Sequence, residues 1–261
     1  MAKFEELEIV RWDKGEMSLL GDDVVVESSL DLVLNDRNLV TLMCSPEDRR
    51  VLALGYLKSE GIIEGLDDVT EISFDRDKKS IELIVGHDSF DPDSYFERKR
   101  TLTSSCGKAS AIIENLEDLQ VGIANPDEFP RVTKLTELMK GLQKKAELFR
   151  KTGGSHTAAL ANTESIEYLS EDIGRHNAID KVIGKAVVDG RGLEELTLLT
   201  SGRLSSEMVL KGIRSSIPVI VSRSAPTTLA VRMGRLTGIV MVGFVRGNRL
   251  SVYSGEDKFD R

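Results

Sequence analysis

Cys106 has the surroundings in this chain that best suit nucleophilic chemistry. It lies among small residues just before a helix expected from about Ala109 to Leu116, and Lys108 follows it closely. A helix N-terminus and a nearby lysine both stabilise a thiolate, the form of cysteine that attacks sulfur. Cys106 is therefore a candidate nucleophile or persulfide carrier. The alternative is a small buried cysteine that fills a turn.

Cys44 is the second of the two cysteines. It follows Leu42 and Met43, so we expect it to end a buried strand, where thiols are usually inert. Two cysteines form at most one disulfide, and a chain of this length needs none. We therefore expect free thiols and a reducing, cytoplasmic location.

Residues 171–181 form the densest group of polar side chains, at the start of a helix expected over residues 172–188. Asp172 is expected to cap this helix. His176 lies one turn from Asp172 and from Asp180, so a carboxylate could orient its imidazole. The alternative is a capped, solvated helix with surface ion pairs.

Gly153 and Gly154 precede an apolar stretch that begins beside His156. Glycines let the backbone approach an anion closely, and a histidine can bind a ligand or relay a proton. A plain turn before a strand is the alternative.

Three polar segments follow three short apolar runs that we expect to be strands. They are Ser201–Arg203, Ser222–Pro226 and Arg246–Arg249. Ligands bind at the carboxyl ends of strands in an open α/β sheet, and two of these segments open a helix whose N–H groups favour phosphate. The hydroxyls and guanidinium groups together predict an anionic, phosphate-bearing ligand.

The first hundred residues, which must support these groups, read as mostly strand. We expect a turn at Asn35-Asp36, a helix that starts at Ser45-Pro46-Glu47-Asp48 and ends near Gly61, and a hairpin around residues 76–79. The expected strands are Val24–Val26, Leu30–Leu34, Leu39–Met43, Val69–Phe74 and Ser80–Val85.

From Thr152 onward strands and helices alternate, after a long amphipathic helix expected from about Thr133 to Arg150. This alternation of helices with near-continuously apolar strands predicts a buried, largely parallel sheet. The expected strands are 157–161, 165–169, 197–200, 218–222, 239–245 and 250–253, and the expected helices are 172–188, 205–215 and 227–236. We predict a mostly β segment over 1–100, a cysteine-bearing loop and connector over 101–132, and an α/β cofactor-binding domain over 133–261.

Composition and missing motifs exclude several classes. The 261 residues are 40% hydrophobic and 30% charged, with a net charge of −8 that argues against binding nucleic acid. The sequence lacks a phosphate-binding P-loop, zinc-finger spacing, the zinc deaminase motifs and a G-x-S-x-G elbow, so we expect no metal site. The acidic N-terminus does not read as a secretory signal, and the apolar run 238–245 is too short to cross a membrane.

Taken together, several stretches resemble the FdhD family, the sulfur carriers that mature formate dehydrogenase. The likeness runs from about residue 24 to 254, and its most distinctive part is EDIGRHNAIDK at residues 171–181. The other stretches that carry it are 43–46, 54–63, 104–107, 153–156, 201–203, 224–226 and 243–247.

The resemblance implies a cytidine-deaminase-like mixed α/β fold without zinc, a smaller mostly β N-terminal segment, and a homodimer. It also implies a sulfurtransferase whose Cys106 accepts sulfur from a cysteine desulfurase as a persulfide. That sulfur would pass to the bis-molybdopterin guanine dinucleotide cofactor before the cofactor enters the formate dehydrogenase catalytic subunit. The cofactor would be a client rather than a permanent group, and a GDP-like nucleotide would suit the same site.

The family's molybdenum-cofactor contact region falls on Phe244 to Arg249. Combined with the strand-end and turn residues above, it gives a set of candidate cofactor-binding residues. These are Phe244, Val245, Arg246, Gly247, Asn248, Arg249, Ser201, Arg203, Ser224, Gly153, Gly154, His156, Asp172 and His176.

One position departs from the family pattern. Many relatives carry a C-G-x-C-G motif, and this chain has Ala109 where the second cysteine would stand. A mechanism that needs two thiols in that loop cannot operate here, whereas a one-thiol persulfide relay can. The departure keeps open a non-catalytic chaperone that binds the molybdenum cofactor without moving sulfur. A zinc deaminase relative is a third reading, which would require stoichiometric zinc.

Overall fold

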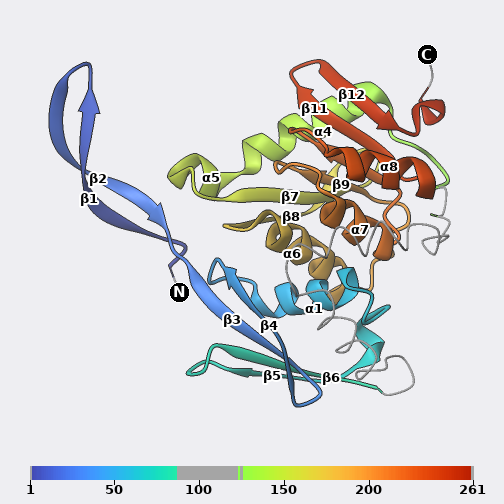
Figure 1. Cartoon of the computed structure of the whole chain (residues 1–261), viewed down its shortest axis with the longest axis horizontal. Coiled ribbons are helices and arrows are strands. Elements are labelled where there is room, and N and C mark those ends of the chain that lie inside the picture. The colour runs from blue at the N-terminus through green and yellow to red at the C-terminus, as the bar shows by residue number, and fades with distance from the viewer. Residues whose placement is uncertain (1, 87–122, 124–125, 260–261) are drawn as a thin grey trace.

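The computed structural model describes residues 2–86, 123 and 126–259, and these residues form a mixed α/β fold with three sheets (Figure 1). The mixed α/β class and the small N-terminal β segment are confirmed. Cys106 and Ala109, with the expected loop at 87–100 and helix at 109–116, lie outside the described residues. The division into three parts stays a prediction.

A six-stranded sheet forms the larger body. Its order is β12 (Arg249–Ser254), β11 (Val240–Arg246), β10 (Val219–Ser222), β9 (Thr197–Thr200), β7 (His156–Ala161) and β8 (Ile166–Asp172). The pairs β9–β10 and β10–β11 are parallel, and the other three are antiparallel. The sheet is therefore mixed, and the expectation of a largely parallel sheet was wrong. Strand spacing alone did not fix the direction of β7, which runs against β9.

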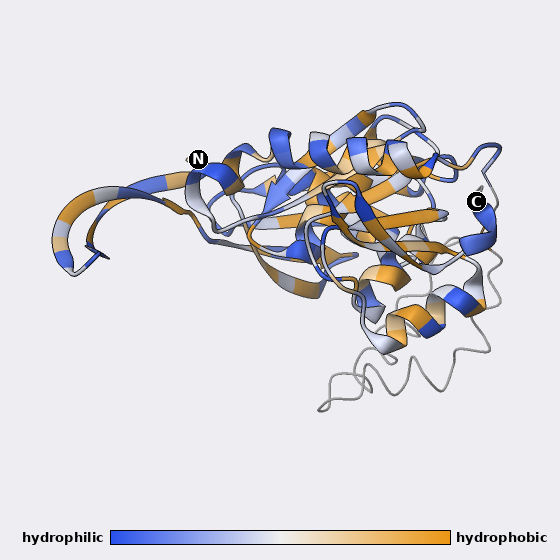
Figure 2. Ribbon diagram, turned by 90° about the horizontal axis from the view of Figure 1, so that it is seen from above, coloured by the Kyte–Doolittle hydropathy of each residue, from blue (hydrophilic) through white to orange (hydrophobic). Residues whose placement is uncertain are grey.

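Helices cover both faces of this sheet. α4 (Val132–Lys145) packs on one face, where its leucines meet apolar side chains of β7 and β9 to β11. The other face is covered by α6 (Arg175–Val188), α7 (Ser206–Arg214) and α8 (Thr228–Thr237). β9 and β10 are buried along their whole length, as their continuous apolar runs predicted, and Figure 2 shows hydrophobic residues concentrated in the central strands.

A four-stranded sheet lies beyond these helices, in the order β4 (Arg37–Cys44), β3 (Ser28–Leu34), β6 (Ser80–Val85) and β5 (Val69–Asp75). The turn at Asn35-Asp36 and the β5–β6 hairpin are confirmed. A short 3-10 turn, η1 (Leu66–Asp68), precedes β5, and η2 (Glu256–Lys258) follows β12.

α1 (Arg49–Ser59) joins the two bodies by packing closely against α6. A Cβ on Gly55 would lie 1.7 Å from the carbonyl oxygen of Asp180, and one on Gly184 would lie 1.8 Å from that of Val51. The two glycines therefore let the backbones approach to a distance that no side chain permits. One continuous apolar core runs from the six-stranded sheet through this crossing to the four-stranded sheet.

A long two-stranded ribbon, β1 (Phe4–Asp13) and β2 (Glu16–Val25), projects away from the rest of the molecule (Figure 1). The sequence pattern predicted only a short strand at 24–26, so this ribbon was not expected. Lys14 and Gly15 form its tight turn, both with positive φ, a pattern typical of two-residue hairpin loops.

Three helix boundaries differ from those expected. The helix expected from Ser45 begins at Arg49. Asp48 adopts a left-handed conformation, and the Ser45 hydroxyl donates a hydrogen bond to the buried carboxylate of Asp172. The helix expected from Asp172 begins at Arg175 after the extended Gly174, while Asp172 ends β8. The expectation that Asp172 caps this helix was wrong.

The long helix expected from Thr133 is broken at Ala146 into α4 and α5 (Glu147–Thr152). Ala146 has ψ 76, outside the helical range, and Glu171 of β8 accepts hydrogen bonds from the N–H groups of Leu148 and Phe149 at 2.7 and 2.9 Å. A carboxylate remote in sequence therefore caps a new helix start. None of the helices in the described parts of the chain is long and apolar enough to span a membrane.

Candidate functional site

The polar segments that follow the strands meet at one edge of the six-stranded sheet. β9, β10 and β11 end there, and β8 ends beside them because it also runs opposite to β7. Backbone hydrogen bonds connect neighbouring segments along this edge. The N–H groups of Ser201, Arg223 and Phe244 donate to the carbonyl oxygens of Thr157, Thr200 and Ser224, respectively. The expectation that these segments share an edge is confirmed. α6, α7 and α8 each begin at the same edge.

His156 and Ser201 form the centre of this edge. The Ser201 hydroxyl accepts a hydrogen bond from the N–H of Thr157 at 3.0 Å and lies 3.3 Å from His156 Nδ1. Burial, and then the electrostatic effect of the neighbouring Arg175 and His176, lower the pKa of His156 below its ordinary value of 6.5. At neutral pH the imidazole is therefore uncharged, and it can both donate and accept a hydrogen bond.

A cavity of about 330 Å³ lies between this pair and the helices α4 and α5. Its lining combines apolar side chains with hydroxyl, imidazole and guanidinium groups, a combination typical of small-molecule sites. The lining residues are Met139, Leu142, Gln143, Ala146, Phe149, Arg150, Ser155, His156, Thr157, Ser201 and Arg223.

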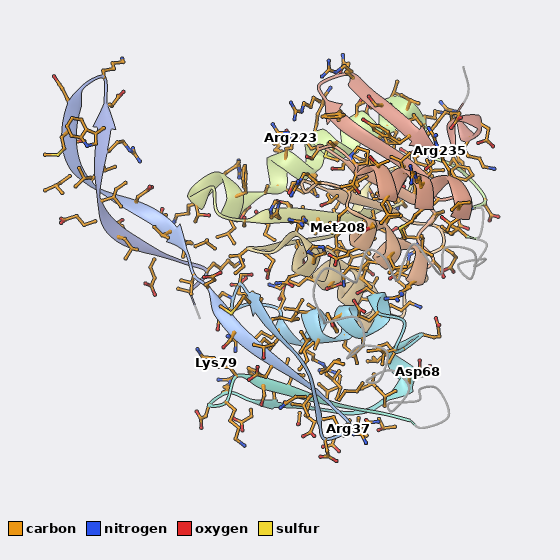
Figure 3. The ribbon with its side chains drawn as sticks, viewed as in Figure 1. Arg37, Asp68, Lys79, Met208, Arg223 and Arg235 are labelled. Atoms are coloured by element: carbon orange, nitrogen blue, oxygen red, sulfur yellow. The ribbon has the colours of Figure 1, made fainter. Side chains whose placement is uncertain are left out.

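Arg223 lies within the predicted segment Ser222–Pro226 but was not among the candidate binding residues. It lies on the exposed loop after β10, at the end of the sheet opposite to Arg235 (Figure 3). Its position directly after a buried strand is the sequence signal that could have identified it as a site residue. Nothing in the sequence pointed to the α4–α5 residues, because their apolar spacing reads as core packing.

The loop after β9 is held in a fixed shape. Ser222 Oγ donates to the carbonyl of Gly202 at 2.6 Å and accepts from the N–H of Ser224 at 2.8 Å. A Cβ on Gly202 would lie 2.9 Å from the Cβ of Arg175, so glycine lets the α6 N-terminus approach this loop. Arg203 is exposed beside it. The structure thus brings Ser201, Arg203 and Ser224 to the edge, and their role in binding stays a prediction.

The β11–β12 hairpin contributes the predicted segment 244–249. Phe244 has a positive φ of 52 and lies at a bulge, and the guanidinium of Arg246 lies 5.9 Å from its ring centre. Asn248 Oδ1 accepts a hydrogen bond from Lys140 of α4 at 2.9 Å. The predicted residues Arg246, Gly247, Asn248 and Arg249 are exposed on this hairpin, whereas the Val245 side chain is buried under α4.

The predicted glycine pair forms a turn. Gly153 ends α5 in a left-handed conformation with φ 67, which is the ordinary structural use of glycine. A Cβ on Gly154 would lie 2.6 Å from Cγ1 of Val25, so this glycine accommodates the base of the β1–β2 ribbon. The local structure therefore explains why glycine stands at both positions, and contact of either glycine with a ligand stays a prediction.

Asp172 is fully buried, and its neighbours within the protein occupy both carboxylate oxygens. It accepts hydrogen bonds from the N–H and Oγ of Ser45 at 3.0 and 2.9 Å and from the N–H of Gly174 and Asn177 Nδ2, each at 2.9 Å. Lys181 Nζ pairs with it at 2.7 Å. Any part that Asp172 plays in ligand binding is therefore to position the loop between β8 and α6.

His176 does not line the cavity beside His156. Its Nε2 lies 3.2 Å from Glu207 Oε2 of α7, and it borders a separate cavity of about 280 Å³. The expectation that Asp172 or Asp180 orients this imidazole was wrong, because Asp180 pairs with Lys211 at 2.9 Å. The carboxylate that lies beside this imidazole is that of Glu207, remote in sequence.

Cys44 ends β4 in the core and is 0% exposed, as expected. Burial, together with the negative charge of Asp172, raises the pKa of its thiol from 9.0 to about 11. At neutral pH this cysteine is a protonated thiol that is buried away from solvent. Within the described part of the chain, no group of three or more His, Cys, Asp or Glu side chains is placed to hold a metal ion.

The fold and this edge define a class: a mixed α/β protein with a candidate binding site at the strand ends. The chain belongs to the FdhD/NarQ family, whose model matches residues 25–260. It is 36% identical over 258 residues to the sulfur carrier protein FdhD of Listeria monocytogenes serotype 4b (strain F2365), with 96% of each chain covered. It is 32% identical over 254 residues to the sulfur carrier protein FdhD of Bacillus subtilis (strain 168), with 96% of this chain and 95% of the relative covered.

A solved structure shares the fold. The chain is similar to a candidate formate dehydrogenase accessory protein from Desulfotalea psychrophila, with a TM-score of 0.78 at 24% identity, covering 99% of this chain and 100% of the other. At this identity the likeness supports the arrangement of the elements and nothing finer.

Proposed function

We propose that this protein is a sulfur carrier that serves formate dehydrogenase, with Cys106 as the sulfur-bearing residue. Relatives covering almost the whole chain carry the name sulfur carrier protein FdhD. The proposed client is the bis-molybdopterin guanine dinucleotide cofactor. The proposed partners are a cysteine desulfurase, which donates the sulfur, and the catalytic subunit of formate dehydrogenase, which receives the finished cofactor. A cytoplasmic location belongs to the same proposal.

The observation that carries the assignment of Cys106 is the burial of Cys44. A sulfur carrier needs a thiolate that a partner protein can reach, and the raised pKa and full burial of Cys44 deny it both properties. The sequence holds two cysteines, so Cys106 is the other one.

Transfer of sulfur from the desulfurase to this protein requires only one thiol on the receiving chain. The Cys106 thiolate attacks the outer sulfur of a persulfide on the desulfurase, a new S–S bond forms, and the S–S bond of the donor breaks. The desulfurase cysteine leaves as a thiolate. No second cysteine is consumed, so Ala109 does not prevent this step.

The strand-end edge supports binding of the nucleotide end of the client. His156, Ser201 and Arg223 offer neutral and cationic hydrogen-bond donors around a cavity that apolar side chains of α4 and α5 also line. An arginine fork suits phosphate, and an apolar slot of this kind suits a flat ring. We assign the negatively charged cofactor to this edge, with Arg246 and Arg249 on the neighbouring hairpin.

A second candidate function is a chaperone that binds the molybdenum cofactor without moving sulfur. Ala109 in place of the family's second loop cysteine favours it. The binding edge described above would serve either function, so binding alone does not separate them.

Loading of sulfur separates the two. The purified protein is incubated with a cysteine desulfurase and cysteine, and the intact protein and its peptides are weighed by mass spectrometry. The carrier predicts one added sulfur on the Cys106 peptide, retained in Cys44→Ala and absent from Cys106→Ala. An unmodified chain beside an active desulfurase would establish the chaperone instead. Sulfur on Cys44 alone would refute the choice of thiol.

A further inference from the structure

A groove of about 820 Å³ lies between the start of α1 and the strand β5, on the body formed by the four-stranded sheet. It is larger than the two cavities of about 330 and 280 Å³ described above. None of the residues that line it is among the predicted cofactor-binding residues. The groove therefore has no part in the function proposed so far.

β5 is an edge strand of its sheet. In the part of the chain that the structure describes, it pairs with β6 alone, at one end of the order β4–β3–β6–β5. It lies along the margin of the molecule that faces away from the six-stranded sheet (Figure 1). The second side of an edge strand presents backbone N–H and C=O groups that can pair with a further strand.

The face of β5 that turns toward the core is only partly covered. Ile72 pairs with Leu83 and Phe74 pairs with Ile81, and both partners are buried in the core. Residues paired across two strands share a face of the sheet, so Ile72 and Phe74 are on the core side. Ile72 is nevertheless only half-buried, and Phe74 is 44% exposed. An apolar strip is thus left open to the groove.

Three arginines line the groove beside this strip: Arg49, Arg50 and Arg76. Arg49 is 7% exposed, donates a hydrogen bond from Nη2 to Ser28 Oγ at 2.6 Å, and has its guanidinium 5.8 Å from the ring centre of Phe74. Arg50 and Arg76 are exposed. Positive charge is therefore held next to an open aromatic ring.

The two carboxylates of the groove do not cancel this charge. Asp48 Oδ2 lies 3.1 Å from Lys185 Nζ, which offsets its charge. Glu71 pairs with Ile84, and successive residues of a strand alternate in direction, so Glu71 is on the opposite face from Ile72. The groove is thus locally basic in a chain whose net charge is −8. Electrostatic complementarity favours an acidic occupant here.

We propose that β5 binds an extended, acidic segment of a partner protein, which joins the four-stranded sheet as an additional strand. Backbone pairing with β5 holds the segment in an extended form. Every second side chain of that strand faces the groove, where apolar groups contact Ile72 and Phe74 and carboxylates contact the three arginines. The inference concerns recognition of a partner and does not depend on the sulfur-carrier proposal.

A phage library of random decapeptides, selected on the immobilised wild-type protein, supplies the probe. We expect enriched peptides that carry apolar and acidic residues at every second position. The enriched peptide is then made with a fluorescein label, and its anisotropy gives the dissociation constant. The same peptide with lysine in place of each acidic residue should bind more weakly by about tenfold or more.

Neighbouring positions on opposite faces of β5 test the apolar contact. Phe74→Gln removes the ring from the groove and should weaken binding by about tenfold or more, as expected for an aromatic anchor. Ser73→Gln introduces the same side chain on the other face and should bind the peptide as the wild type does. Phe74 is partly exposed, so circular dichroism should show both variants folded.

The charged contact is tested with exposed residues alone. The double variant Arg50→Glu/Arg76→Glu should weaken binding by about thirtyfold or more, and this difference should shrink in about 0.5 M salt because salt screens exposed charges. Arg37→Glu is the control, because Arg37 begins the strand β4 at the other edge of the same sheet.

Strand addition has its own test. A strand added at an edge uses only every second backbone amide, so of two peptides methylated on alternate nitrogens, one should lose binding and the other should keep it. Equal binding of both methylated peptides would contradict strand addition. Enrichment of no peptide or of basic peptides would overturn the proposal, as would binding that survives both Phe74→Gln and Arg50→Glu/Arg76→Glu.

Discussion

The side chains of Asp172 and Lys181 meet at 2.7 Å inside the protein, where they are 0% and 1% exposed. Ser45 bonds to both of them, and Asn177 bonds to Asp172 and to the carbonyl of Met43. This group ties the end of β4 to the loop between β8 and α6. It therefore fixes the side of the strand-end edge that adjoins the four-stranded sheet.

Removing one member of this pair should strongly destabilise the fold. Asp172→Ala leaves the Lys181 ammonium buried without its counter-ion, so we expect the free energy of unfolding to fall by about 3–5 kcal/mol. Urea unfolding followed by circular dichroism measures the loss. Glu47→Ala removes the exposed Lys3–Glu47 pair and should cost less than about 1 kcal/mol. Equal effects of the two substitutions would contradict a structural role for the buried pair.

The crossing of α1 and α6 should tolerate no side chain at its two glycines. In Gly184→Ala the new Cβ would meet the Val51 carbonyl, so the helices must separate, and we expect a loss of about 3 kcal/mol or more. Gly65→Ala is the control, because nothing lies within 4 Å of a Cβ there and its backbone is extended. Similar melting temperatures for the two variants would show that the crossing is looser than described.

The Cys44 thiol should resist alkylation in the folded protein. In Cys106→Ala, which retains only Cys44, iodoacetamide at about pH 8 should leave the native chain unmodified, because burial keeps the thiol protonated below its pKa of about 11. Mass spectrometry after the same treatment in urea should show complete modification. Rapid labelling of the native protein would mean that Cys44 is accessible and would reopen it as a sulfur carrier.

His156 should remain neutral to lower pH than an ordinary histidine. Its folded-state pKa is depressed, so the neutral ring contributes stability above pH 6.5, and this contribution is lost as the pH falls through the lowered pKa. NMR titration of the imidazole resonances should show one midpoint below 6.5, and His156→Asn should abolish that resonance. A midpoint at or above the ordinary value would place His156 in solvent or beside an acid.

The strand-end cavity should bind a guanine nucleotide through Arg223. Arg223→Ala should weaken binding of GDP by about tenfold or more, because it removes a charged hydrogen-bond donor from the cavity. Isothermal titration calorimetry gives the affinity. Arg76→Ala is the matched control, because Arg76 lies on the turn between β5 and β6, on the other body. If both variants bind GDP as the wild type does, the nucleotide does not use this cavity.

The sequence by itself determined the elements whose residues decide their own local structure. The buried runs of β9 and β10, the Asn35-Asp36 turn and the starts of α7 and α8 all appear at or within a residue of their expected positions. The sharing of one edge by the strand-end segments also followed from the alternation of strands and helices. These features depend on apolar periodicity and on turn and cap residues, which act over a few positions.

Tertiary structure alone decided the features that depend on residues far apart in the chain. Glu171 caps the new helix start after Ala146. Glu207, rather than Asp172 or Asp180, lies beside His176. Ser45 does not start a helix but donates a hydrogen bond to a carboxylate 127 positions away. The direction of β7 and the cavity between α4–α5 and the sheet arise in the same way. The physical reason is that each depends on which elements pack together, and contacts of this kind leave no periodic signal in the sequence.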